Sequence, residues 1–308
     1  MACVLFEIWL VVLFAFALDG LVSFRMPLSF SCSRQQQQAL SGRVGRKAEK
    51  MAGTLRRTST KQVPLEVDTL EFVASRVRAM APSLVQGLRE KGYFMADEVL
   101  SSAMCSTLRN EAVKLYNDGS FTLSQSARWD PISKSLVTYS KHNVYSTELK
   151  GGESYYDAPQ LHEYVFALIK TVVPILSEAF PGTHLSPTHH ATKLAVCTGD
   201  GSRYDKHYDN AGLDDVRKVT FLYYMNKNWR DECAGQFRVY NNDGSTTDIE
   251  PLADRMLVFW SDRMVHSVEA SFAPRGEEDH RYALTVWLTT TDVAFIERND
   301  AMVKLHFG

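Results

Sequence analysis

In the first half of the folded part of the chain, apolar residues recur at intervals of three and four, the spacing of one buried helix face. One such series follows Pro64, a second covers about residues 98–117, and a third covers about residues 161–180. We therefore expect three amphipathic helices here, and Pro174 can kink the third of them.

After about residue 190 the pattern changes to short runs rich in β-branched and aromatic residues, separated by Gly, Asn and Asp. These runs are residues 191–197, 218–225, 236–240, 255–260, 265–271 and 281–290. Several strands with no helices between them predict an antiparallel sandwich or barrel. Helices first and strands second predict an α+β, mainly β fold, in which a helical layer supports a β-sandwich. Residues 121–156 are polar and aromatic, and we expect strands and loops there.

The N-terminal residues differ in composition from the rest of the chain. An apolar run over residues 4–18 is short for a membrane span and typical of a signal-peptide core, so we interpret residues 1–23 as signal-like. Residues 24–63 are basic and poor in acidic residues, as in a transit peptide or a linker. The folded domain is then expected at residues 64–308, with its core at about 190–290.

This leader predicts that the protein enters the endomembrane system. Its two parts resemble the bipartite leaders of algal complex plastids, so a complex plastid is one destination. The alternative is the secretory pathway, the endoplasmic reticulum or a membrane anchor. We expect that the mature form is not embedded in a membrane.

The whole chain has 308 residues, 45% of them hydrophobic and 23% charged, with a net charge of −2. This balance gives no electrostatic reason to expect nucleic acid as a partner, and nothing in it indicates an oligomeric state. The five cysteines are scattered and form no CxxC pair, which argues against a disulfide framework and a structural zinc site.

The chemistry is suggested by His207 and Asp209, two residues apart, whose side chains would share one face of an extended chain. One His and one carboxylate can hold two adjacent positions on an iron ion, and a second His completes the facial triad of the non-haem Fe(II) oxygenases. The candidate for that ligand is His266, in a later predicted strand. Alone, an HxD motif is a weak signal.

A cosubstrate dianion needs a cation, and a guanidinium is the best match for a carboxylate. Arg281 begins an alternating strand after His266, and an inward-facing Arg there implies an anionic partner. Without further information, an Arg facing solvent at the edge of the sheet is an equal alternative.

A series of motifs in one order makes the interpretation more specific. The motifs are HYDN at 207–210, VTFLYYMNKNW at 219–229, GQFRVY at 235–240, DIEP at 248–251, DRMLVFWSDR at 254–263, His266, and RYALTVW at 281–287. This series resembles the catalytic core of the oxygen-sensing prolyl hydroxylases, within the prolyl 4-hydroxylase-type Fe(II)/2-oxoglutarate dioxygenases.

The resemblance implies a double-stranded β-helix, or jelly roll, with flanking helices. It implies that the iron ligands and catalytic residues are His207, Asp209 and His266, and that Arg281 and Tyr224 bind the distal carboxylate of 2-oxoglutarate. Leu222 and Phe237 match apolar residues that line the same pocket. It also implies Fe(II), 2-oxoglutarate and O₂ as reactants, with ascorbate to keep the iron ferrous.

The sequence departs from the family pattern in three places. A tyrosine expected near the cosubstrate, about ten residues before the HxD motif, is absent, and Thr198 is the candidate replacement. The spacing from His266 to Arg281 is longer than in the family, so Arg275 is a second candidate, although only Arg281 has the strand motif after it. Residues 121–156 do not match the family's substrate-binding loops.

We therefore expect hydroxylation of a substrate C–H, peptidyl proline being the first candidate, with release of succinate and CO₂. The substrate is then a protein or peptide, or a small molecule. The alternatives are the same chemistry on a non-prolyl side chain or small metabolite, and an inactive jelly-roll binding module.

Overall fold

The computed structural model describes residues 68–130, 135–210 and 214–297. The chain divides into two units, Met1–Pro64 and Leu65–Gly308, and all the described residues lie in the second. The expected signal-like segment 1–23 and transit-like segment 24–63 lie outside the described residues.

Three α-helices lie within the described residues, and they match the three predicted from the apolar spacing. They are α2 (Thr69–Glu90), α3 (Ser102–Asn117) and α4 (Pro159–Ala179). Asp68 caps the start of α2 by accepting from the backbone N–H of Leu70, and Ser101 caps α3 by accepting from Met104 N–H. Each helix buries one apolar face, so packing rather than local propensity holds it in place.

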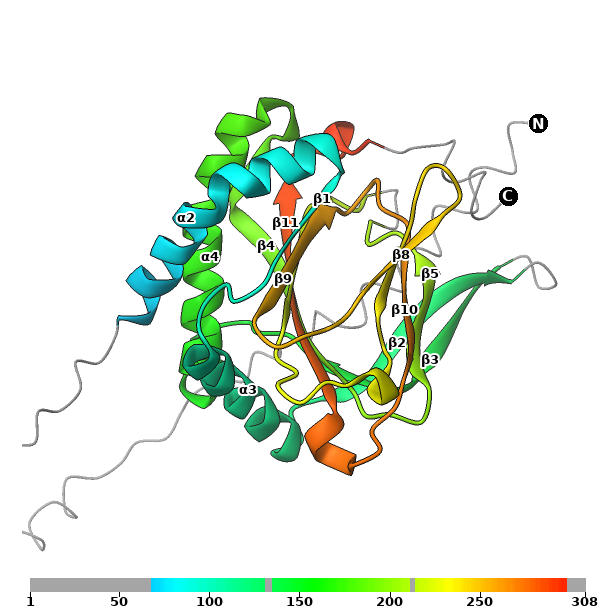
Figure 1. The fold of residues 1–308 in the computed structure, drawn as a ribbon. Helices are drawn as coiled ribbons and strands as arrows, with labels where there is room; N and C mark the ends of the chain where they lie inside the picture. Colours follow the sequence, from blue (N-terminus) through cyan, green and yellow to red (C-terminus); the bar gives the residue numbers. More distant parts are fainter. Residues whose placement is uncertain (1–67, 131–134, 211–213, 298–308) are drawn as a thin grey trace, which may run out of the picture. The chain divides into compact units, whose positions relative to one another are not determined.

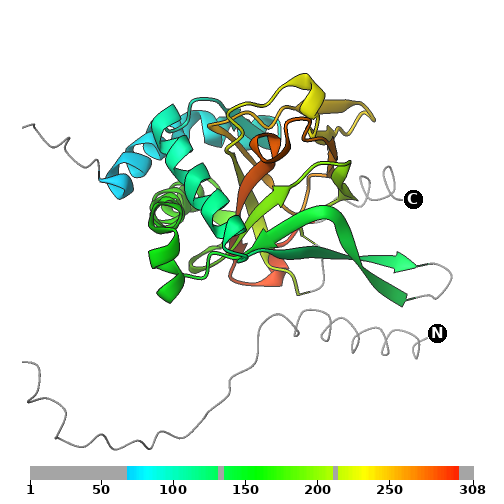
Figure 2. The same cartoon turned by 90° about the horizontal axis from the view of Figure 1, so that it is seen from below.

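The strands form two antiparallel sheets (Figures 1 and 2). The larger sheet has seven strands, in the order β1 (Tyr93–Ala96), β9 (Arg255–Trp260), β6 (Arg217–Tyr224), β11 (Arg281–Thr290), β4 (Leu185–Cys197), β3 (Ser135–Thr147) and β2 (Thr122–Asp130). The smaller sheet has four, in the order β5 (Ser202–His207), β10 (His266–Ser271), β7 (Phe237–Tyr240) and β8 (Thr246–Ile249). Short 3₁₀ turns complete the fold at η1 (Gly152–Asp157), η2 (Pro181–Thr183), η3 (Asp231–Cys233), η4 (Gly276–Asp279) and η5 (Val293–Phe295).

The two faces of the larger sheet pack against different partners. Side chains alternate along a strand, so on β6 Phe221 and Tyr223 belong to the hydrophobic core shared with the helices. Leu222 and Tyr224 belong to a second apolar cluster with residues of the smaller sheet, such as Phe237. The helices thus cover the outer face of the larger sheet (Figure 1), and the space between the two sheets is left for the site.

The α+β jelly-roll prediction is confirmed by these helices and sheets. The six predicted strand runs correspond to β4, β6, β7, β9, β10 and β11, although β4 begins six residues earlier than expected, at Leu185. Strands β2 and β3 fall in the stretch 121–156, where strands and loops were expected. No helix in the described part of the chain is long and apolar enough to cross a membrane.

Candidate active site

Three side chains predicted as metal ligands meet between the sheets. His207 ends β5 and His266 begins β10, and the two residues are direct partners in the antiparallel pairing of these strands. Asp209 follows two residues after His207, and its Oδ1 lies 3.6 Å from Nε2 of each histidine. Ligand atoms of all three lie within 4.8 Å of one another, which is close enough to share one ion.

Backbone carbonyls orient both imidazole rings. Nδ1 of His207 lies 2.6 Å from the carbonyl oxygen of Asp205, and Nδ1 of His266 lies 3.2 Å from that of Met264. A carbonyl can only accept, so each Nδ1 carries the proton and each Nε2 keeps its lone pair for a metal. This is the orientation by outer hydrogen bonds that metal-binding histidines commonly show.

Asp209 is oriented by two donors from the larger sheet. Its Oδ2 accepts from the hydroxyl of Thr220 at 2.7 Å and from the indole N–H of Trp287 at 3.1 Å. Thr220 also shares a hydrogen bond with Ser261 at 2.8 Å. Since Oδ2 is occupied, Oδ1 is the oxygen left to face the histidines.

The charges at this centre favour a cation. Burial, followed by the neighbouring His207, lowers the pKa of His266 to about 3, so this imidazole is neutral near pH 7. Burial alone would raise the pKa of Asp209, but contacts with His207 and His266 outweigh it, and the pKa falls below its usual range. Two neutral imidazoles and one carboxylate are the donor set of the Fe(II) oxygenases, so these residues fit ferrous iron.

Apolar side chains line the His266 side of the metal-binding cluster. Phe237 stacks on the ring of His266 with 4.6 Å between centroids, and Phe259 meets the same ring edge-on at 5.0 Å. Leu222 packs against this cluster from β6. A low-polarity wall of this kind excludes water and strengthens the electrostatic interactions inside.

Arg281 on β11 and Tyr224 on the neighbouring strand β6 have few hydrogen-bond partners. Arg281 is 6% exposed, and its Nε donates to the carbonyl of Gly235 at 2.9 Å. The guanidinium carbon lies 5.1 Å from the centroid of the Tyr224 ring, and this nearby charge acts to lower the pKa of the Tyr224 hydroxyl. The buried Tyr224 hydroxyl has no hydrogen-bond partner among the described residues, and burial raises its pKa to about 12.

Unpaired buried donors are costly, so an arginine and a phenol in this state imply a ligand. A carboxylate would accept from both groups at once. The pair therefore fits the distal carboxylate of 2-oxoglutarate, with the keto acid end reaching toward the triad.

Gly235 makes room for Arg281. Its φ is +74°, a conformation that favours glycine, and a Cβ there would lie 2.7 Å from Cβ of Ser271 and 3.1 Å from Cδ of Arg281. The side chain of Arg281 therefore packs in the space that any side chain at position 235 would need.

The alternative arginine has a different environment. Arg275 is partly exposed, and it forms an ion pair with Asp279 at 2.6 Å within the turn at η4. Of the two arginines considered, Arg281 is the buried one that faces the space between the sheets.

Thr198 follows the last residue of β4, and its hydroxyl donates to the carbonyl of Asn143 at 3.2 Å. Cys197, one residue earlier, is buried and lies directly opposite Arg281 in the β4–β11 pairing. A contact between Thr198 and the cosubstrate stays a prediction.

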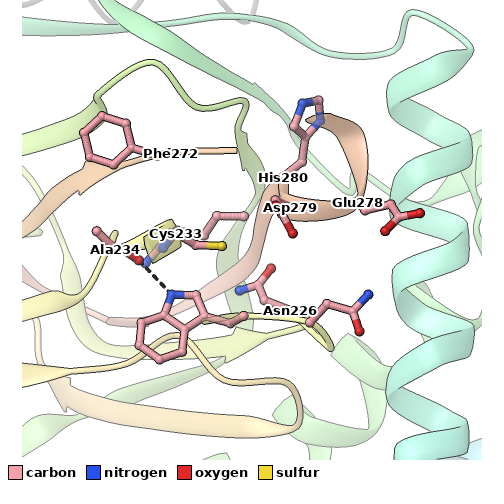
Figure 3. A pocket seen from close by; sticks show the side chains of 10 residues that line it. Asn226, Cys233, Ala234, Phe272, Glu278, Asp279 and His280 are labelled. Atoms are coloured by element: carbon pink, nitrogen blue, oxygen red, sulfur yellow. Dashed lines mark hydrogen bonds between the residues drawn. The ribbon is translucent and has the colours of Figure 1, made fainter. Parts of the chain in front are cut away.

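Arg281 also lines a small pocket (Figure 3). It is lined by residues that include Cys233, Phe272 and His280, and the indole of Trp229 donates to the Ala234 carbonyl beside it at 2.7 Å. None of the triad residues lines it. We therefore assign it to the packing behind the arginine and not to a substrate site.

Two polar residues of the sequence motifs, Asn210 and Asp254, have structural tasks. The Asn210 amide donates to the carbonyls of Asp215 and Arg217, each at 2.8 Å, and so holds the chain that follows Asp209. Asp254 accepts from Tyr223 Oη and Leu100 N–H, on the side of the larger sheet that faces the helices. Asn210 thus supports the site, whereas Asp254 joins a strand to the segment before α3.

Comparisons with known proteins agree with this geometry. Residues 192–289 match the family described as the 2OG-Fe(II) oxygenase superfamily. The hypoxia-inducible factor prolyl hydroxylase of Caenorhabditis elegans is 28% identical over 238 residues, which are 74% of this chain and 30% of that protein. The human prolyl hydroxylase EGLN3 is 41% identical over 97 residues, which are 30% of this chain and 38% of that protein.

Comparison with a solved structure shows that the fold is also similar. The prolyl hydroxylase of Trichoplax adhaerens, in complex with a hypoxia-inducible factor peptide fragment, is 25% identical with a TM-score of 0.57, over 70% of this chain and 90% of that one. Residues 192–289 thus match the 2OG-Fe(II) oxygenase superfamily, and the chain is similar to prolyl hydroxylases. The chain spans about a third of the length of the curated relatives named above.

Some residues of the site were not singled out from the sequence. The hydrogen bonds that Trp287 and Thr220 donate to Asp209 were not foreseen. Alternation along β6 from Tyr224 through Leu222 to Thr220 is the signal that could have found Thr220.

Proposed function

We propose that this oxygenase hydroxylates a C–H bond of its substrate in an Fe(II)- and 2-oxoglutarate-dependent reaction, with peptidyl proline as the substrate residue. The observation that supports this most is the pairing of the His207, Asp209 and His266 cluster with Arg281 and Tyr224, which have few hydrogen-bond partners among the described residues. The first set fits the metal, and the second fits the cosubstrate.

The roles of the residues follow from their positions. His207, Asp209 and His266 would hold Fe(II) on one side, leaving the opposite side for ligands. Bound there, Fe(II) with 2-oxoglutarate and O₂ supplies the oxidation: one oxygen atom enters the substrate C–H, the other enters succinate, and CO₂ leaves. Arg281 and Tyr224 orient the cosubstrate, and Phe237 and Leu222 exclude water.

The proline assignment rests on the relatives. Two of them carry prolyl hydroxylase in their names, and the Trichoplax protein was solved with a peptide fragment. The same site chemistry would serve a non-prolyl side chain or a small metabolite. We also propose that ascorbate maintains the ferrous state, as the resemblance implies.

The proposal can be tested with the purified chain, Fe(II), 2-oxoglutarate and ascorbate. Proline-containing peptides should raise the conversion of 2-oxoglutarate to succinate, and mass spectrometry should find a peptide product heavier by one oxygen atom. His266→Ala should abolish both signals. No formation of succinate with any peptide or metabolite pool would contradict the proposal and favour an inactive binding module.

We further propose, from the sequence alone, that residues 1–23 direct the chain into the endomembrane system and that residues 24–63 act as a transit-like or linker segment, with a complex plastid as one destination. N-terminal sequencing of the mature protein from cells tests this. A mature chain that still begins at Met1 would contradict it.

A further inference from the structure

Two lysines enter the space between the sheets without an acidic partner. Lys141 lies on β3 and Lys193 on the neighbouring β4. Both are partly buried, and no carboxylate of a described residue lies within 4 Å of either ammonium nitrogen. Lysines in proteins seldom lose water without gaining an anion.

The two ammonium groups converge on one aromatic ring. Nζ of Lys141 lies 4.2 Å from the centroid of Tyr204, and Nζ of Lys193 lies 5.8 Å from the same centroid. Tyr204 belongs to β5, the strand that carries His207, and its ring stacks loosely with that imidazole at 6.5 Å. The lysines are thus on the side of the site formed by β5.

Strand pairing places Lys193 near the metal-binding end of the site. On β11, Arg281 pairs with Cys197, whereas Thr285 pairs with Lys193. Four residues along a strand span roughly 13 Å, so Lys193 lies well away from Arg281. Trp287, two residues beyond Thr285, bonds the carboxylate of Asp209.

The lysines also keep donors for a ligand. Nζ of Lys193 donates one hydrogen bond, to the hydroxyl of Ser124 at 2.9 Å, and Nζ of Lys141 donates none to a described residue. Burial lowers the pKa of both groups, Lys193 lowers that of Lys141 further, and the charge of Asp209 offsets only part of these effects. Two like charges held together in this way would be relieved by an anion bound between them.

We propose that Lys141 and Lys193 bind a carboxylate of the substrate, so that this oxygenase prefers a substrate with a negative charge close to the carbon it hydroxylates. This inference rests on the proposed function. The distal carboxylate of the cosubstrate is matched by Arg281 and Tyr224, and its keto acid end would lie at the metal, so neither needs the lysines.

The carboxylate can come from two sources with the same chemistry. One is an acidic residue beside proline in a peptide, and the other is the α-carboxylate of a free amino acid. Each source has a neutral counterpart of nearly the same shape, which allows charge to be tested alone.

The experiment uses the whole chain and four probes: a peptide with Glu on both sides of a single proline, the same peptide with Gln, free L-proline, and L-prolinamide. Steady-state kinetics would be measured for the native chain, Lys141→Met, Lys193→Met and the Lys193→Arg variant. Lys170→Met is the matched control, because Lys170 lies on α4 over Phe166 and away from the site.

We expect the native chain to prefer one charged probe over its neutral counterpart by at least about tenfold in kcat/KM, as for a hydrogen-bonded charge pair. Either Met variant should remove most of that preference by raising KM, while the KM for 2-oxoglutarate stays unchanged. Lys193→Arg should keep part of the preference, and Lys170→Met all of it. Which charged probe is preferred identifies the source.

Binding of the same probes to the chain loaded with Mn(II) and 2-oxoglutarate, measured by calorimetry, separates this inference from the proposed function. If a charged probe binds, both Met variants weaken it and no product forms, the proposed function fails and the carboxylate site stands. Equal kinetics for charged and neutral probes would overturn the carboxylate site alone. A rise in KM for 2-oxoglutarate in the Met variants, or no binding of any probe, would overturn it as well.

Discussion

Trp287 donates its indole N–H to Oδ2 of Asp209 over 3.1 Å, so the strand that begins with Arg281 also orients the carboxylate of the metal-binding triad. One strand of the larger sheet therefore contributes to both halves of the site. Substitutions in β11 should therefore weaken either iron binding or 2-oxoglutarate binding, depending on whether they lie at Trp287 or at Arg281.

Trp287→Phe should weaken metal binding because it frees Oδ2 of Asp209 to rotate away from the histidines. Loss of an outer hydrogen bond of this kind typically costs about 10–100-fold in metal affinity. The affinity for Mn(II) should be measured by titration, with Trp229→Phe as the control, since that indole bonds the Ala234 carbonyl instead. Equal Mn(II) affinity in both variants would show that Trp287 does not orient the ligand.

Arg281→Met should raise the KM for 2-oxoglutarate by roughly 10–100-fold, the value of one or two charge-assisted hydrogen bonds. Arg275→Met is the control, because that arginine is paired with Asp279 and partly exposed. The KM of each variant would be obtained by measuring succinate release as a function of 2-oxoglutarate concentration. If Arg275→Met has the larger effect, Arg281 does not bind the cosubstrate.

Tyr224→Phe should stabilise the ligand-free protein or leave it unchanged, because the hydroxyl removed is buried and lacks a partner among the described residues. The gain is expected to reach about 1 kcal/mol, and the affinity for 2-oxoglutarate should fall at the same time. Tyr223→Phe is a matched control, since the neighbouring hydroxyl donates to Asp254 at 2.7 Å and its loss should destabilise by about 1–3 kcal/mol.

Urea unfolding measures both variants. Equal destabilisation by the two changes would mean that the Tyr224 hydroxyl has a partner in the ligand-free protein. It would then no longer be evidence for a bound carboxylate.

The stability of the protein should depend on pH through Lys141. Burial, followed by repulsion from Lys193, lowers the pKa of Lys141 from 10.5 to about 7. Between these two values the unfolded chain binds more protons than the folded chain, so the free energy of unfolding should rise with pH in this window. Lys141→Met should abolish that rise.

Other ionisable groups also lie near this ammonium. Those acting on it are Lys193, Cys197, Asp205 and Asp209, and Tyr204 lies beneath it. The comparison is therefore between the slopes of the native chain and of Lys141→Met, from urea unfolding at pH 7 to about 9.5. If the free energy of unfolding changes with pH equally in the two proteins, the pKa of Lys141 is the same in the folded and the unfolded chain.

Much of the fold follows from local patterns. The alternation of β11 and the helical spacing before residue 180 are strong because each of these elements buries one or both faces. Strands β1, β5 and β8 were not among the predicted strand runs. Strands β5 and β8 are mostly polar, so they lack the apolar and aromatic pattern that marked the short β7.

The site residues also differ in how well the sequence predicts them. His207, Asp209, His266 and Arg281 belong to sequence motifs, whereas Lys141 and Lys193 lie outside them. Lys141 faces the site although alternation from the inward-facing Val144 would turn it outward. Asn143 between them has a φ of +52°, which breaks the alternation. Such an irregularity depends on packing between β3 and β5 and leaves no periodic signal in the sequence.

Gly235 gives the keto acid site a weakness that the metal centre does not share. A methyl group at this position would clash with Cβ of Ser271 and press on Cδ of Arg281, whereas none of the three metal-binding side chains is among its nearest neighbours. A substitution at this one position should therefore impair 2-oxoglutarate binding more than metal binding.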